Sequence, residues 1–236
     1  LGVYNLGYQI PFLFHAAVMG SFMRIWSPNI FALKNDAASK EDVRRIGTLV
    51  ALSIGGLYAQ VALFGREAIQ LIGRQDSYQA ANEVVPWVAM GYVAFALYGL
   101  SQAALMSVFA VRALAVLNGL ALAVNLALNY LWIPEYGYVG AAAATTASFA
   151  VLALSSAGMS AVRGIPPFSV ASVLIGALLV VGASVAGAFI DQATEAWAIG
   201  GLAAKAGISL TLVALLFAAL PSMERRKLVA RIRPSR

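Results

Sequence analysis

This sequence predicts an all-α fold, a polytopic transmembrane helix bundle of about seven helices. The first observation is the run from Val84 to Pro134, whose fifty-one residues include a single charged side chain, Arg112. About 20 apolar residues of helix cross a hydrocarbon core of roughly 30 Å, so this run has room for two crossings joined at Arg112. The second observation is the composition: 61% hydrophobic residues, 11% charged residues and a mean hydropathy of +0.81 lie outside the usual range of soluble domains. Long uniform apolar runs favour helices over the alternating strands of a membrane barrel.

Seven apolar runs justify the seven helices, and proline or glycine marks most of the breaks between them. Pro28 lies near the end of the first run, Pro86 near the start of the third, and Pro134 with Gly137 separates the fourth from the fifth. We take residues 1–222 as one transmembrane domain and residues 223–236 as a basic cytoplasmic tail. The predicted helices cover residues 4–33, 46–64, 84–111, 113–133, 139–162, 168–190 and 196–220.

The basic residues sort to alternate sides of the seven predicted crossings, twelve on one side against Arg66 and Arg74 on the other. Cytoplasmic loops carry the excess of Lys and Arg, which predicts that the N-terminus of this chain lies outside and the C-terminus in the cytoplasm. We therefore expect the net charge of +6 to meet membrane lipids and not nucleic acid. The tail serves either as a topology anchor or also as a contact for anionic lipid. The twelve are Lys34, Lys40, Arg44, Arg45, Arg112, Arg163, Arg225, Arg226, Lys227, Arg231, Arg233 and Arg236.

Several chemistries lack the residues that they need. The chain has no cysteine and a single histidine, His15, so we expect no cofactor and no metal site. We find no catalytic motif and predict that the protein is not an enzyme. All ten acidic residues map to predicted loops or the tail, so a carboxylate for coupling to an ion gradient would have to come from elsewhere in the protein.

Polar side chains inside the predicted helices are the candidates for a substrate pathway. Asn118, Asn125 and Asn129 follow one another at spacings of seven and four, which places them within roughly 40° on one helix face. Such a stripe either makes hydrogen bonds between helices or forms a cavity wall that binds sugar hydroxyls.

The first predicted helix carries a second stripe, with Tyr8 and His15 on one face and Gln9 beside it. An aromatic belt with helix packing explains such residues near the membrane interface. His15 lies deeper in the helix, and we weigh a role in the substrate pathway for it against packing.

Two cations fall at membrane depth. Arg24 lies nine residues after His15 and therefore on the opposite face; it either extends to the cytoplasmic headgroups or contacts a substrate phosphate. Lys205 lies within the last predicted helix, where a central lysine costs about 2.5 to 3.5 kcal/mol. Its partner is either a neighbouring helix, through Ser or Thr hydroxyls, or an anionic lipid group.

Three local patterns resemble a known family. Gly2-Val3-Tyr4 opens the first helix and Trp26-Ser27-Pro28 closes it; the most specific pattern is Asn125-Leu126-Ala127-Leu128-Asn129, continuing through Ile133-Pro134-Glu135-Tyr136-Gly137 to Gly140-Ala141-Ala142. Together they resemble the C-terminal half of the polysaccharide and O-antigen (lipid-linked oligosaccharide) flippases, in the multidrug/oligosaccharidyl-lipid/polysaccharide exporter superfamily. The resemblance covers about residues 1–162.

The resemblance implies one lobe of a two-lobed exporter that works by alternating access. The expected substrate is a polyprenyl-diphosphate-linked glycan, and the expected location is the bacterial inner membrane. Because the chain begins at Leu1, we interpret it as N-terminally truncated, with the missing N-terminal half of the same protein as a partner. The alternatives are a cation-coupled drug exporter of the same superfamily and a membrane-bound polysaccharide polymerase or glycosyltransferase.

Overall fold

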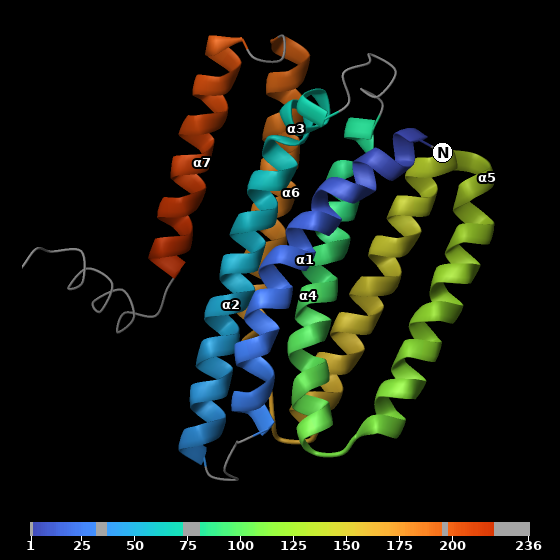
Figure 1. The fold of residues 1–236 in the computed structure, drawn as a ribbon, viewed down its shortest axis with the longest axis vertical. Helices are drawn as coiled ribbons and strands as arrows, with labels where there is room; N and C mark the ends of the chain where they lie inside the picture. Colours follow the sequence, from blue (N-terminus) through green and yellow to red (C-terminus); the bar gives the residue numbers. More distant parts are fainter. Residues whose placement is uncertain (1, 32–36, 73–80, 195–197, 220–236) are drawn as a thin grey trace, which may run out of the picture.

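A computed structural model describes residues 2–31, 37–72, 81–194 and 198–219, and confirms the predicted all-α fold (Figure 1). Within these ranges the chain forms helices and no strand. The predicted tail, residues 223–236, lies outside the described residues. The helices are α1 (Gly2–Phe31), α2 (Ala37–Leu63), α3 (Gly65–Ile72), α4 (Val85–Ser107), α5 (Val111–Val162), α6 (Val170–Ala193) and α7 (Ile199–Ala219).

Helix α5 is a hairpin of two arms. Gly137 interrupts it with φ 56° and ψ −132°, three residues after Pro134. Figure 1 shows the chain rising along the first arm, turning, and descending along the second arm. The chain can turn at this point because Gly137 adopts a positive φ that residues with a Cβ rarely adopt. The two arms on either side of the turn correspond to the predicted helices 113–133 and 139–162.

Two boundaries and one additional helix differ from the hydropathy prediction. Helix α2 begins at Ala37 and not at residue 46, since its charged first turns are helical although they are too polar to be counted as a membrane span. The turn after α4 comes at residues 108–110, where Phe109 has φ 55°, so Arg112 lies inside α5. The three turn residues are apolar, so the hydropathy of the sequence does not reveal that a turn occurs there. The short helix α3 was not predicted at all.

The described residues include five helices long and apolar enough to cross a membrane: 39–63, 81–107, 111–162, 170–193 and 199–218. The third of these contains both arms of the α5 hairpin. Helix α1 is 30 residues long but more polar, because Asn5, Gln9 and His15 lower its hydropathy. By length and composition these helices are those of a multi-pass membrane protein.

Helix α4 forms the centre of the bundle and packs against α1, α2, α5 and α6. Helices α2 and α6 cross so closely at Gly55 and Gly176 that a Cβ added at Gly55 would overlap the Cα of Gly176. Helix α7 stands at one edge against α2 and α6, and the first arm of α5 stands at the opposite edge (Figure 1). The α7 edge contains the buried ion network described next, and the α5 edge contains the asparagine stripe.

Candidate functional site

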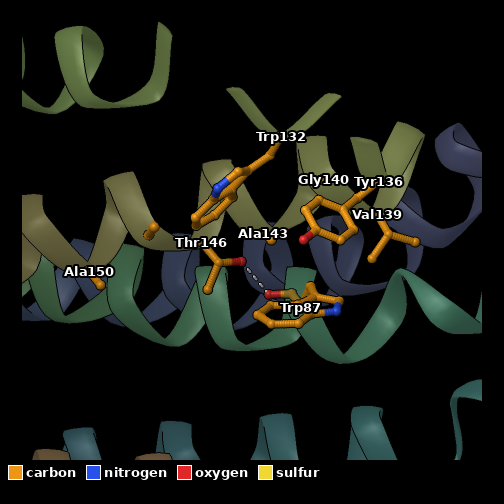
Figure 2. A pocket seen from close by; sticks show the side chains of 9 residues that line it. Trp87, Trp132, Tyr136, Val139, Gly140, Ala143, Thr146 and Ala150 are labelled. Carbon is orange, nitrogen blue, oxygen red and sulfur yellow. Dashed lines mark hydrogen bonds between the residues drawn. The ribbon is translucent and has the colours of Figure 1, made fainter. Parts of the chain in front are cut away.

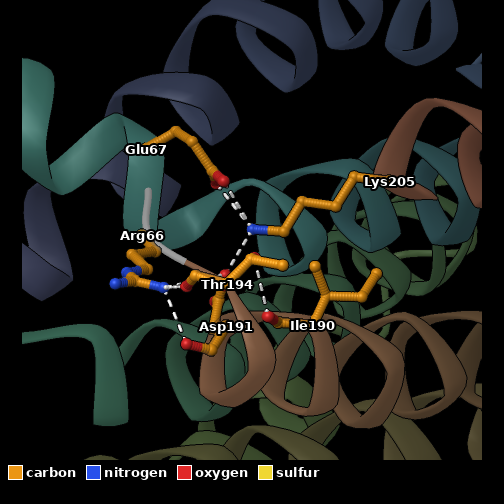
Figure 3. A network of polar contacts seen from close by, with 6 residues as sticks. All are labelled: Arg66, Glu67, Ile190, Asp191, Thr194 and Lys205. Carbon is orange, nitrogen blue, oxygen red and sulfur yellow. Dashed lines mark hydrogen bonds and ion pairs between the residues drawn. The ribbon is translucent and has the colours of Figure 1, made fainter. Parts of the chain in front are cut away.

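The most unusual site is a buried ion network around Lys205, shown in Figure 3. The residue is 0% exposed. Its Nζ lies 2.7 Å and 2.8 Å from the two carboxylate oxygens of Glu67, and 2.7 Å from Oδ1 of Asp191. The Phe64 ring centroid lies 5.9 Å from the same Nζ. One ammonium group thus joins α3, α6 and α7.

Arg66 completes this network from the neighbouring position on α3. Its Nη1 donates hydrogen bonds of 2.8 Å to the backbone oxygens of Asp191 and Thr194, and lies 3.7 Å from Oδ1 of Asp191. Those carbonyls belong to the last turn and C-cap of α6, where helix carbonyls lack intrahelical partners and attract cations. Two cations therefore balance two carboxylates.

Local structure explains how these side chains meet. Gly65 lets the chain leave α2 and start α3 close to α4, because a Cβ there would lie 2.9 Å from Cγ1 of Val85. Glu67 then falls in the first turn of α3, where a carboxylate is favourable. Lys205 lies six residues after the start of α7, about 9 Å along its axis. In Figure 1, α3, the end of α6 and the start of α7 share one end of the bundle with the start of α1.

The network corrects two expectations from the sequence. Glu67, expected in a loop, is a helical residue only 7% exposed, and Asp191 lies within α6. Lys205 contacts carboxylates and not the expected Ser or Thr hydroxyls. The available signal was a charge match: a lysine buried in an apolar helix needs an acid, and the predicted loops that hold Glu67 and Asp191 fall on the same side of the seven predicted crossings.

His15 lies in an aromatic cluster between α1, α2 and α4. Its Nδ1 is 2.9 Å from the hydroxyl of Tyr58, and its ring centroid is 4.8 Å from Tyr92 and 5.3 Å from Phe95. Tyr8 packs edge-on against the same Tyr92 at 5.7 Å. These contacts are those of helix packing.

Gln9 and Arg24 are not part of that cluster. Both residues are exposed on α1. The structure therefore does not bring them together with His15.

The predicted asparagine stripe is found on the first arm of α5, where its amides make hydrogen bonds. Asn118 donates to the hydroxyl of Tyr98 at 2.9 Å, and Asn125 donates to Oγ of Ser148 at 3.2 Å. Asn129 donates to Oδ1 of Asn125 at 2.9 Å, whereas its own Oδ1 is buried without a partner among the described residues. An open hollow of about 560 Å³ is lined by Asn129, Tyr130, Leu131, Ile133 and Pro134.

An apolar pocket of about 480 Å³ lies between α4 and the α5 hairpin (Figure 2). The rings of Trp87 and Trp132 approach it from opposite sides, with Tyr136 beside them. Thr146 donates a 2.6 Å hydrogen bond to the backbone oxygen of Trp87. The lining residues are Trp87, Trp132, Tyr136, Val139, Gly140, Ala143, Thr146, Ala147 and Ala150.

In the part of the chain that the structure describes, no three His, Asp or Glu side chains are grouped to hold a metal ion. Comparisons with protein-family models, curated proteins and solved structures find no match to this chain. The structure shows a helical bundle with five helices long and apolar enough to cross a membrane, in which buried charges join the start of α7 to α3 and α6.

Proposed function

We propose that the chain is one lobe of a transporter that flips lipid-linked oligosaccharide, or exports polysaccharide, across the bacterial inner membrane by alternating access. The Lys205 network is the observation that carries the proposal of transport. Ionisable groups at membrane depth are expensive and mark substrate or ion pathways. Four of them converge here where α3, α6 and α7 meet.

The resemblance supplies the substrate class. Its most specific segment, Asn125 to Ala142, contains the turn of the α5 hairpin at Gly137. Asparagine amides offer both donors and an acceptor for sugar hydroxyls. Asn129 lines the open hollow at the end of the first arm, and this proposal assigns its amide to the glycan.

The network suits a helix that must move between two states. Ion pairs hold the start of α7 through a few directional contacts, whereas Gly55 and Gly176 lock α2 against α6 by backbone contact. With the predicted orientation, the network lies at the outer end of the bundle. We therefore assign it to closing the outer side, and its separation to opening that side.

A cation-coupled drug exporter is the second candidate, and Glu67 and Asp191 favour it. Both carboxylates are largely buried, with side chains 8% and 15% exposed, and each can accept a proton or a cation once Lys205 moves away. Drug efflux that collapses when the proton or sodium gradient is dissipated, with normal surface polysaccharide in the deletion strain, would select this candidate.

The direct test is deletion of the gene. We expect polyprenyl-linked glycan to accumulate on the cytoplasmic leaflet and surface polysaccharide to be lost. Normal surface polysaccharide without accumulated intermediate would contradict the proposal.

Complementation tests the role of the network itself. The triple variant Lys205→Met with Glu67→Gln and Asp191→Asn removes the buried lysine and both carboxylates together and leaves Arg66 on its backbone oxygens, so we expect it to insert at normal abundance and fail to restore export. Restored export by this variant would show that the charges serve only to hold the fold. An impermeant label on a C-terminal tag checks the proposed orientation, because labelling in intact cells would place that end outside.

A further inference from the structure

Gln60, near the end of α2, carries a buried amide without a partner. Its Oε1 and Nε2 are both buried and make no hydrogen bond among the described residues. The residue lies within the apolar span 39–63. A polar group left unpaired in such surroundings is costly, and buried polar side chains nearly always have a partner. The amide therefore points to a partner that the observed arrangement does not supply.

The amide lies on the face of α2 that meets α7. Gly56, Gln60 and Phe64 follow one another at spacings of four, which places them on one helix face. The backbone N–H of Phe64 donates to the oxygen of Gln60 at 3.0 Å, so the helical course continues past the end of α2. A Cβ added at Gly56 would overlap Cδ1 of Leu216 on α7. The Phe64 ring centroid lies 5.9 Å from Nζ of Lys205, also on α7. Gln60 lies between these two contacts and therefore faces the same helix.

The ammonium of Lys205 has a short path to this amide. One helical turn, about 6 Å along the axis, separates Gln60 from Phe64, whose ring is already beside the ammonium. A lysine carries its charge on a flexible four-carbon stem with three rotatable donors. Reorientation of the stem, with a small movement of α7, thus changes the partner of the ammonium without moving the whole bundle.

Separation of the ion network creates the need for such a second partner. A buried ammonium that leaves Glu67 and Asp191 without finding another acceptor is strongly unfavourable. The amide oxygen of Gln60 can accept a charge-assisted hydrogen bond, and the face of Phe64 attracts a cation on the way. Arg66 stays on its backbone oxygens, because its hydrogen bonds do not involve Lys205. Gln60 precedes α3, which lies at the end of the bundle, so the ammonium moves inward while the carboxylates remain at that end (Figure 1).

We propose that Gln60 is the second acceptor of Lys205. In the observed arrangement the ammonium binds Glu67 and Asp191, and in the open arrangement it passes Phe64 and binds Oε1 of Gln60. The inference rests on the proposed function and deepens it, by naming where the charge goes when the outer side opens. A water molecule that satisfies the amide in both arrangements is the competing explanation.

Chemical labelling of the two carboxylates tests the inference. A water-soluble carbodiimide with an added amine converts accessible carboxyl groups to amides, and mass spectrometry measures the extent at Glu67 and Asp191 separately. We use the purified protein in phosphatidylethanolamine and phosphatidylglycerol nanodiscs. Both carboxylates are protected while Lys205 is paired with them, so slow labelling reports the fraction of molecules in which the ammonium has left.

Two variants at position 60 should shift this labelling in opposite directions. Gln60→Met keeps the length of the side chain and removes the acceptor, so we expect labelling to fall about tenfold, the effect of one lost charge-assisted hydrogen bond. It should fold at least as well as the unmodified chain, because the amide has no hydrogen bond to lose. Gln60→Glu offers the ammonium a carboxylate and should raise labelling. The matched control is Gln102→Met, at a half-buried amide on α4, which should leave labelling unchanged.

Three results would overturn the inference. Equal labelling of Gln60→Met and the unmodified chain shows that water alone satisfies the amide. A change in the same direction in Gln60→Met and Gln60→Glu shows that position 60 acts through packing and not as an acceptor. Complete protection of both carboxylates in every variant shows that the ammonium does not leave them.

The labelling measures no transport and therefore separates this inference from the proposed function. Stranded glycan in the deletion strain together with unchanged labelling in Gln60→Met overturns the second acceptor and leaves the function. Opposite shifts in the two variants without stranded glycan overturn the function and leave the second acceptor.

Discussion

The two edges of the bundle stabilise polar groups in lipid in different ways. At the α7 edge, Lys205 is fully buried against the charged carboxylates of Glu67 and Asp191. At the α5 edge, Asn118 and Asn125 make neutral hydrogen bonds to Tyr98 and Ser148. A charge left without its partner is far more costly than an amide left without one. We therefore expect substitutions of the polar residues to destabilise the fold more at the α7 edge than at the α5 edge.

Loss of Lys205 should have the largest effect. Lys205→Ala leaves the two buried carboxylates of Glu67 and Asp191 with Arg66 as their one remaining cation, and we expect the free energy of unfolding to fall by about 3 to 5 kcal/mol. Unfolding in detergent micelles measures it. The control is the triple variant with Met, Gln and Asn at positions 205, 67 and 191, which should recover most of the loss because the only charge left in the network is Arg66, whose hydrogen bonds to the backbone oxygens of Asp191 and Thr194 remain. A loss below about 1 kcal/mol in Lys205→Ala would contradict the charged character of this edge.

The close crossing of α2 and α6, the two helices against which α7 packs, should show the second largest effect. Gly55→Ala places a Cβ against the backbone of Gly176, which cannot move aside as a flexible side chain can, so we expect a loss of about 1 to 3 kcal/mol. Gly182→Ala on α6 is the matched control, since nothing lies within 4 Å of its added Cβ. It should be neutral or stabilising by up to about 1 kcal/mol in the same unfolding measurement. Equal destabilisation by both substitutions would argue against the close crossing.

At the α5 edge, the hairpin turn should show a smaller effect. Gly137→Ala meets no neighbouring atom within 4 Å, so its cost comes from the backbone alone, about 1 to 2 kcal/mol for a Cβ at φ 56°. Gly119→Ala on the first arm also meets nothing and has ordinary helical geometry, which makes it the control. Unfolding measurements that rank Gly119→Ala as the more damaging would disprove the turn at Gly137.

The smallest expected effect is at Asn118. A double-mutant cycle of Asn118→Ala with Tyr98→Phe should give a coupling energy of about 0.6 kcal/mol, the average for hydrogen bonds between membrane helices. A coupling energy as large as the loss in Lys205→Ala would remove the contrast between the two edges.

Much of the architecture was predictable from hydropathy, and the exceptions have a common cause. Lipid requires long apolar helices, so the long segments stand out in the sequence, and the spacing of Asn118, Asn125 and Asn129 placed their amides on one face. Helix α3 was missed because it has only eight residues, too few for a membrane span. The break between α4 and α5 was predicted at Arg112 and is found at Phe109, because the residues of the turn are as apolar as the helices beside it.

The candidate site was predicted in part. Lys205 was identified because a lysine inside an apolar helix is rare, and its need for a partner followed from the cost of burying it. The partner itself was not identified, because Glu67 is 138 positions away and lies on a helix that the hydropathy does not reveal. His15 was identified as unusual, but its contact with Tyr58 depends on how α1 crosses α2.

The sequence by itself determined that the chain forms apolar helices, where most of them lie, and which polar residues they carry into the membrane, since hydropathy and helical spacing are local properties. Only the tertiary structure decided which of those residues meet. Contacts such as Lys205 with Glu67, or the hollow beside Gly140 and Ala150, depend on the crossing of helices distant in sequence, and packing between whole surfaces sets that crossing.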